Sequence, residues 1–184
     1  MFSSTSALAL LEVGSIARGL VLTDTLVKRA EVEVLRAHPI DPGKYLIVFA
    51  GPVADVEEAL GAAEAAARGA IIARLLLPTP HDRLALALRA NHTLPAIDAL
   101  GIFEAHTLVG AVLGLDKALK VAEVAVVELR LGAGLGGKGY FLVSGDLYDV
   151  EAAMEGASAL VGNDAVVEII ARPHADFLKG ALGV

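Results

Sequence analysis

Two short stretches decide how this sequence folds. The stretch Ile40–Lys44 reads Ile-Asp-Pro-Gly-Lys, and Gly134–Lys138 reads Gly-Leu-Gly-Gly-Lys. Asp-Pro-Gly and Gly-Gly are typical of tight turns, and each stretch lies between two apolar segments of strand-like character. Each therefore predicts the turn of a hairpin. The same elements flank both turns in the same order, which indicates that the chain contains an internal repeat of one structural unit.

Working outward from these turns gives the other expected elements. In the first half we expect strands at 7–13, 32–37, 44–50 and 70–77, helices at 16–30 and 53–68, a turn at 38–43, and a short helix opening at Pro80. Ser15 is a favourable N-cap for the first helix, and Gly51 with Pro52 should end the third strand. In the second half we expect strands at 100–105, 124–131, 138–144 and 165–171, helices at 108–122 and 147–160, and a short helix opening at Pro173.

The repeat is also visible residue by residue. Before the turn, identical residues recur 92 positions later, starting at Leu8, Glu12, Asp24, Lys28, Ala30, Glu31, Val32 and Val34. After the turn they recur 94 positions later, starting at Gly43, Lys44, Gly51, Asp55, Val56, Glu57, Ala59, Ala63 and Ala65. These matches include turn glycines and helix starts, so a shared apolar bias does not explain them.

The sequence therefore predicts an α+β chain of two tandem domains, 1–92 and 93–184, with a linker at 91–95. Each domain has the ferredoxin-like order β-α-β-β-α-β plus a short helix. We expect an antiparallel sheet with helices on one face in each domain.

Composition excludes several classes of protein. The chain has 184 residues, a net charge of -7 and no cysteine, which excludes disulfides, thiolate metal sites and cysteine nucleophiles. No basic stripe or aromatic platform suggests a nucleic-acid partner. The best apolar run, 59–77, is interrupted by Glu64, Arg68 and Arg74, so no membrane span is expected. The apolar share of 55% instead favours extensive burial between subunits, and the lack of a basic N-terminal region favours the cytoplasm.

The glycine-rich stretch Gly132–Gly139 fits G-x-G-x-x-G and nearly fits a P-loop. Both motifs need a helix directly after the loop, whereas the residues after Gly139 read as a strand. A P-loop also needs Ser or Thr where this chain has Gly139. Nucleotide binding is therefore not expected.

No other catalytic, cofactor or metal constellation stands out, and an enzyme is not expected. The five histidines lack metal-binding spacing. His81 and His174 each follow a proline ahead of a short helix, which suggests a packing or capping role. Lys28 and Lys120 each follow an aspartate by four positions, at equivalent places in the two halves. These pairs are either exposed helix ion pairs or part of an interaction edge.

Several motifs together resemble the bacterial microcompartment shell-protein domain. They are E-x-x-S-x-A-x-G at 12–19, D-x-x-x-K-x-A at 24–30 and 116–122, G-x-V-x-D-V-E at 51–57, and R-P-H at 172–174, with the P-G-K and G-G-K turns. Two copies in one chain resemble the tandem-domain trimeric shell proteins. The unpermuted order is nearest to the single-layer trimers, such as that of propanediol-utilisation shells.

This resemblance implies a structural shell protein that forms a flat homotrimer mimicking a hexagon. Such a tile would join hexameric and pentameric tiles and pass small metabolites through a central pore. The resemblance places at the pore Asp41, Pro42, Gly43, Leu135, Gly136 and Gly137, and at the tile edge Lys28, Lys120 and Arg172. The first half has Thr79-Pro80-His81 in place of R-P-H, so the arginine contact is expected only at alternate edges.

Some relatives carry cysteine at the position of Asp41 and hold an iron–sulfur cluster on the axis. This chain has aspartate, so no cluster is expected. Three carboxylates could instead attract a hard cation and give the pore mouth a negative potential, while Leu135 would narrow the pore. The alternative function is a cytosolic ferredoxin-like module that binds a small regulator.

Overall fold

The computed structural model describes residues 6–89, 97–132 and 134–182. Contacts divide the chain into two compact units. The first contains residues up to 89 together with Gly132–Gly137, and the second contains the remainder. The ferredoxin-like α+β class expected from sequence is confirmed, because each unit has one four-stranded sheet and two long helices.

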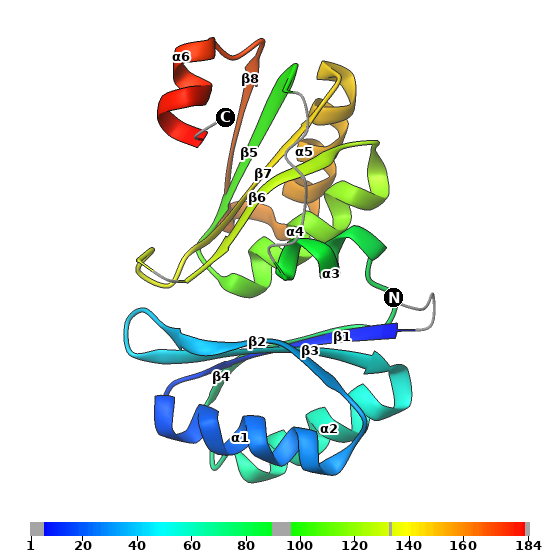
Figure 1. The fold of residues 1–184 in the computed structure, drawn as a ribbon, viewed down its shortest axis with the longest axis vertical. Coiled ribbons are helices and arrows are strands. Elements are labelled where there is room, and N and C mark those ends of the chain that lie inside the picture. The colour runs from blue at the N-terminus through cyan, green and yellow to red at the C-terminus, as the bar shows by residue number, and fades with distance from the viewer. Residues whose placement is uncertain (1–5, 90–96, 133, 183–184) are drawn as a thin grey trace. The chain divides into compact units, whose positions relative to one another are not determined.

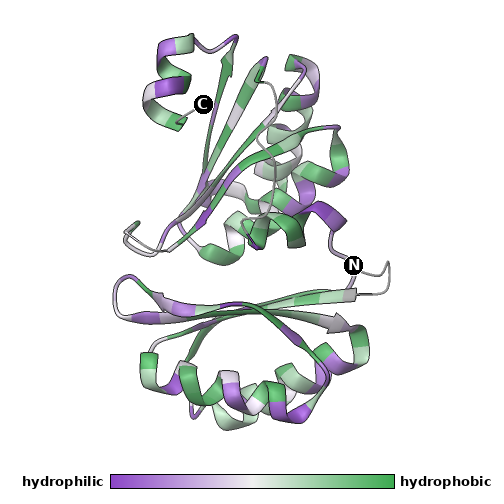
Figure 2. Ribbon diagram, in the orientation of Figure 1, coloured by the Kyte–Doolittle hydropathy of each residue, from purple (hydrophilic) through white to green (hydrophobic). Residues whose placement is uncertain are grey.

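The first unit is an antiparallel sheet in the order β2-β3-β1-β4 with two long helices on one face (Figure 1). Its elements are β1 (Ser6–Val13), α1 (Ile16–Arg29), β2 (Glu33–Ile40), β3 (Lys44–Pro52), α2 (Val53–Ala66), β4 (Ile71–Leu77) and α3 (Asp82–Leu88). Along α1 and α2, hydrophobic and hydrophilic residues alternate (Figure 2), as helices with one buried face require. Leu22 and Leu26 of α1 pack into the core with Phe49 of β3.

The second unit repeats this arrangement with the order β6-β7-β5-β8. Its elements are β5 (Ala99–Ala105), α4 (Leu108–Val121), β6 (Ala125–Leu131), β7 (Gly139–Gly145), α5 (Leu147–Val161), the 3-10 turn η1 (Gly162–Asp164), β8 (Ala165–Ala171), α6 (Ala175–Phe177) and the π-helical turn η2 (Leu178–Leu182). On the helix face, the rings of Phe103 and Phe141 stack with centroids 4.7 Å apart. On the opposite face, Leu182 packs against a cluster that includes Leu100 and Leu142.

The two sheets share an irregularity that supports the repeat. The register between the hairpin strands shifts at Val34/Arg36 in the first unit and at Val126/Glu128 in the second. These positions are 92 residues apart, which is the offset that the sequence gives before the turn.

Several element boundaries differ from the sequence-based expectations by one to three residues, and four of them are informative. Strand β2 continues to Ile40, so the first turn contains only residues 41–43. Strand β3 continues through Pro52, which pairs with Ser6 at the end of the sheet where the strand tolerates proline. The short helices begin at Asp82 and Ala175, two residues after the prolines expected to open them.

The histidines explain where the short helices begin. The Nδ1 atom of His81 accepts a hydrogen bond from the N–H of Arg83 at 3.2 Å, and His174 accepts from Asp176 at the same distance. Each histidine is thus an N-cap, which confirms the capping role. The expected linker at 91–95 and the boundary between 92 and 93 lie outside the described residues, so the domain limits stay a prediction.

Candidate functional site

The first predicted pore turn is a tight connection between β2 and β3. Asp41 is half-buried, while Pro42 and Gly43 are exposed. Gly43 has φ of +77°, a left-handed conformation that only glycine adopts without a penalty. The Asp41–Pro42 peptide is cis. The turn thus presents a carboxylate and bare backbone rather than large side chains.

The second predicted pore turn is longer and rich in glycine. Leu135 is half-buried, Gly136 is exposed and Gly137 is buried. By its contacts the segment Gly132–Gly137 groups with the first unit, which contains the turn of Asp41. The structure thus brings the two turns together, although the sequence alone gave no sign that they touch.

Two hydrogen bonds join these turns. The N–H of Asp41 donates to the carbonyl oxygen of Gly132 at 3.3 Å. In the other direction, the N–H of Gly134 donates to the Asp41 carboxylate. One oxygen of the Asp41 carboxylate therefore holds the neighbouring turn, and the placement of Asp41 at a pore stays a prediction.

An ion pair follows each turn, and sequence reasoning missed both pairs. The Nζ atom of Lys44 lies 2.5 Å from Glu12, and that of Lys138 lies 2.6 Å from Glu104. Lys44 is the first residue of β3 and Lys138 directly precedes β7, and each pairs with a glutamate on the neighbouring inner strand of its own sheet. The signal was available, because both members recur at the repeat offsets. What the sequence could not supply was the antiparallel register that places them side by side.

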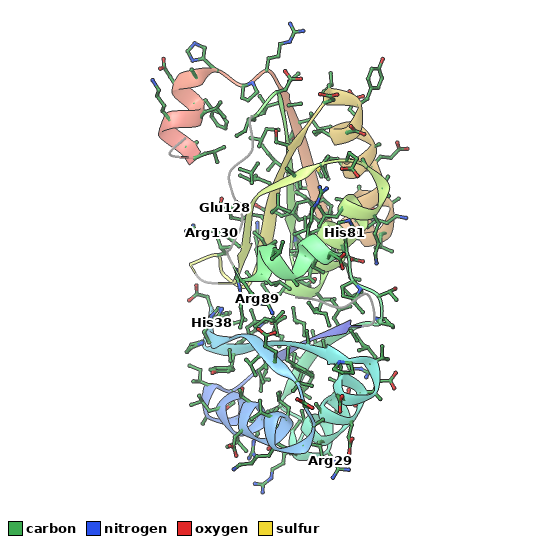
Figure 3. All side chains as sticks on the ribbon, turned by 45° about the vertical axis from the view of Figure 1, so that its right-hand side comes forward. Arg29, His38, His81, Arg89, Glu128 and Arg130 are labelled. Atoms are coloured by element: carbon green, nitrogen blue, oxygen red, sulfur yellow. The ribbon has the colours of Figure 1, made fainter. Side chains whose placement is uncertain are left out.

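A further polar cluster on β6 and β7 has no counterpart in the first unit. The Tyr140 hydroxyl donates to Glu128 at 2.9 Å. Nε of Arg130 lies 3.2 Å from the same carboxylate, and Figure 3 labels Glu128 and Arg130. Burial, followed by the hydrogen bond to Glu128, raises the pKa of Tyr140 above its usual range. The phenol is therefore held in its neutral, hydrogen-bond-donating form.

In the first unit, Arg36 occupies the position equivalent to Glu128 and does something different. Its Nε atom donates to the carbonyl oxygen of Leu88, the last residue of α3. Burial lowers the pKa of Arg36 from its usual value. The guanidinium thus satisfies a helix C-terminal carbonyl and fixes α3 to β2.

The predicted edge residues lie on exposed surface. Lys28 pairs with Asp24 at 2.6 Å, and Lys120 pairs with Asp116 at 2.6 Å. Arg172 is exposed and has φ of +49°, which is uncommon for a residue with a side chain. Its N–H donates to the carbonyl oxygen of Asp98 at 2.8 Å, which holds this conformation.

Two absences concern the described residues alone. Within 6–89, 97–132 and 134–182, no group of three or more His, Asp or Glu side chains could hold a metal ion. In the same part of the chain, no helix is both long and apolar enough to cross a membrane.

Comparison with known protein families identifies the family of this chain. The sequence matches the BMC domain twice, over residues 7–80 and 99–173. This chain belongs to the bacterial microcompartment shell-protein family. Its role is therefore structural rather than enzymatic, and its location is the microcompartment shell. The alternative of a small regulatory module is not favoured.

Individual relatives agree with this assignment. The chain is 31% identical to the bacterial microcompartment shell protein PduT of Citrobacter freundii over 173 residues, covering 92% of this chain and 94% of that protein. The crystal structure of a microcompartment protein from Desulfitobacterium hafniense DCB superposes with a TM-score of 0.89 at 35% identity, covering 96% of this chain and 99% of that one. A fused permuted hexameric shell protein from the RMM microcompartment shares the fold, with a TM-score of 0.65 at 22% identity and coverage of 88% and 86%.

Proposed function

We propose that the shell protein acts as a pseudohexameric homotrimer that tiles the shell facet. In this tile, three copies supply six turns around a central pore for small metabolites. The pore is lined by Asp41, Pro42, Gly43, Leu135, Gly136 and Gly137. Lys28, Lys120 and Arg172 contact neighbouring hexameric or pentameric tiles at the edge.

The observation that supports a trimer is that apolar side chains on α1 are exposed, whereas the equivalent side chains on α4 are buried. On α1, the side chains of Ile16, Leu20 and Val27 form one apolar stripe, and they are 38%, 56% and 44% exposed. Their equivalents on α4, 92 residues later, are Leu108, Val112 and Leu119, which are 0%, 0% and 5% exposed. The apolar stripe is therefore exposed on α1, whereas the equivalent stripe on α4 is buried.

The short helices differ in the opposite sense. Helix α3 of the first unit buries Leu84 and Leu88 completely. The equivalent α6 and η2 of the second unit contain no buried residue, and Phe177 there is 37% exposed. Each unit thus has one exposed helix face, on α1 in the first unit and on α6 and η2 in the second. The equivalent helix of the other unit is buried in each case.

These open faces support a head-to-tail assembly. We infer that the α1 stripe of one copy is covered by the α6 segment of the next. A heterologous contact of this kind closes into a ring when its rotation permits. A ring of three copies contains six repeat units, which matches the hexagonal outline of the tile. Apolar faces of this kind on a shell protein mark a protein–protein interface.

The assembly can be tested by placing a charge in the open face of α1. We expect the wild-type protein to be a trimer by native mass spectrometry and to form sheets by electron microscopy. The substitution Leu20→Asp should dissociate the trimer, because a carboxylate would be buried without a partner. Tyr148→Asp is the matched control, since Tyr148 is 87% exposed on α5 of the other unit. A monomeric wild type, or a Leu20→Asp variant that remains trimeric, would contradict the proposal.

A further inference from the structure

The turn of Asp41 is bound to the glycine-rich turn by more than proximity. The Asp41 carboxylate accepts from the N–H of Gly134, and the Asp41 N–H donates to Gly132. One residue thus supplies both a donor and an acceptor to the segment beside it.

Glycine is required for this close approach. A Cβ atom added at Gly132 would lie 2.9 Å from the Cβ atom of Ile40, which is closer than side chains tolerate. Gly132 and Gly134 also have φ of +76° and +72°, a conformation that favours glycine. Ile40 is only 4% exposed, so it offers a fixed surface rather than a mobile one. The segment therefore rests on Ile40 and is tied at Asp41.

From this geometry we propose that Asp41 is a positioning residue that latches the glycine-rich turn in place at Gly132 and Gly134. Its acceptor oxygen, rather than its negative charge, is what the turn needs. The next step rests on the proposed trimeric tile. In that tile, the latch fixes how far the glycine-rich turn projects into the pore. Asp41 then sets the width of the opening through the position of Gly136 and Leu135.

A latch and a cation ligand make different predictions for substitutions of Asp41. Asparagine keeps a side-chain carbonyl oxygen at nearly the same place, so it retains the acceptor and loses the charge. Alanine loses both. A latch therefore predicts that Asp41→Asn behaves like wild type and that Asp41→Ala does not. A charge-based role predicts that the two variants behave alike.

The bond itself can be measured without any substitution. Gly134 is exposed, so an unbonded amide at this position would exchange its hydrogen about as fast as an unstructured peptide. We expect the Gly134 amide of the wild-type protein to be protected by at least about tenfold, as followed by NMR or mass spectrometry of the peptide around residues 131–138. An unprotected Gly134 amide would overturn the latch, whatever the oligomeric state.

The variants then identify the group responsible. In Asp41→Asn, we expect protection of Gly134 to stay within about threefold of wild type, whereas Asp41→Ala should lose about tenfold or more. Asp164→Ala is the control, because Asp164 is an exposed aspartate of the other unit. Equal loss in Asp41→Asn and Asp41→Ala, or no loss in either, would overturn the proposal.

The consequence for the pore has a separate measurement. Single-channel conductance of assembled wild-type, Asp41→Asn and Asp41→Ala tiles should show a changed opening only in the alanine variant. If the chain proves not to be a trimer, the exchange measurement still decides the latch, so the two failures can be told apart. If Gly134 loses protection and conductance stays constant, the latch does not set the width of the opening and that step is wrong.

Discussion

The two repeat units keep the same ion pairs but bury them to different depths. The Glu12 side chain of the first unit is 4% exposed, whereas that of Glu104 in the second is 40% exposed. For the helix pairs the order is reversed, because the Asp24 side chain is 60% exposed and that of Asp116 is 8% exposed. Duplication has preserved the charges, and the surroundings of each copy now decide how much each pair contributes.

The helix layers differ more strongly. In the first unit, Arg29 of α1 pairs with Glu58 of α2 at 2.7 Å. The equivalent residues of the second unit are Val121 and Ala152, which cannot form this pair. There they line an open, mostly apolar groove of about 560 Å³ between α4 and α5. The same helix pair is thus linked by an ion pair in one unit, whereas the equivalent residues line a groove in the other.

The largest expected effect of this asymmetry concerns the pair of Glu12 and Lys44. Lys44→Met keeps the aliphatic part of the side chain but leaves the buried Glu12 carboxylate without its cation. Breaking a buried pair in this way destabilises by about 3–5 kcal/mol. We expect a loss of this order in the free energy of unfolding, measured by urea denaturation.

The second unit supplies the matched control for this change. Lys138→Met removes the equivalent lysine from the more exposed Glu104, where such pairs contribute about 0–1 kcal/mol. Adding Glu12→Gln to Lys44→Met should recover part of the loss, because no buried charge then remains unpaired. Equal destabilisation by the two lysine substitutions would show that burial does not govern these pairs.

The next effect compares glycines of the two turns. Gly43 and Gly132 have almost the same φ, +77° and +76°, so alanine meets the same backbone penalty of about 1 kcal/mol at each. An added Cβ at Gly43 touches nothing within 4 Å, whereas at Gly132 it meets Ile40. Overpacking of this kind costs a further 1–3 kcal/mol, roughly. Gly132→Ala should therefore lower the melting temperature clearly more than Gly43→Ala. Equal shifts would mean that the Ile40 side chain can move aside at little cost in free energy.

These contrasts show what the sequence could and could not predict. The repeat, the element order and the turns follow from periodicity, turn residues and identities at fixed offsets, which are local signals. The end of β2 was misplaced because the bulge near Arg36 and the strand-forming residues up to Ile40 depend on pairing with β3. The bond between Asp41 and Gly134 joins residues far apart in the chain, and no local pattern announces such a contact.

The smallest expected effect tests whether the two helix layers are interchangeable. Arg29 and Glu58 are both about half-exposed, so a double-mutant cycle with alanine should give a coupling energy of about 0.2–1 kcal/mol that falls as salt rises. Transplanting the pair into the second unit, as Val121→Arg with Ala152→Glu, should give a similar coupling, because the repeat places these residues at equivalent positions on α4 and α5. The single substitutions of each unit complete the two cycles. A coupling present on α1 and α2 and absent on α4 and α5 would mean that the helix pairs differ in spacing as well as in side chains. The groove would then reflect a change in helix packing rather than the loss of one ion pair.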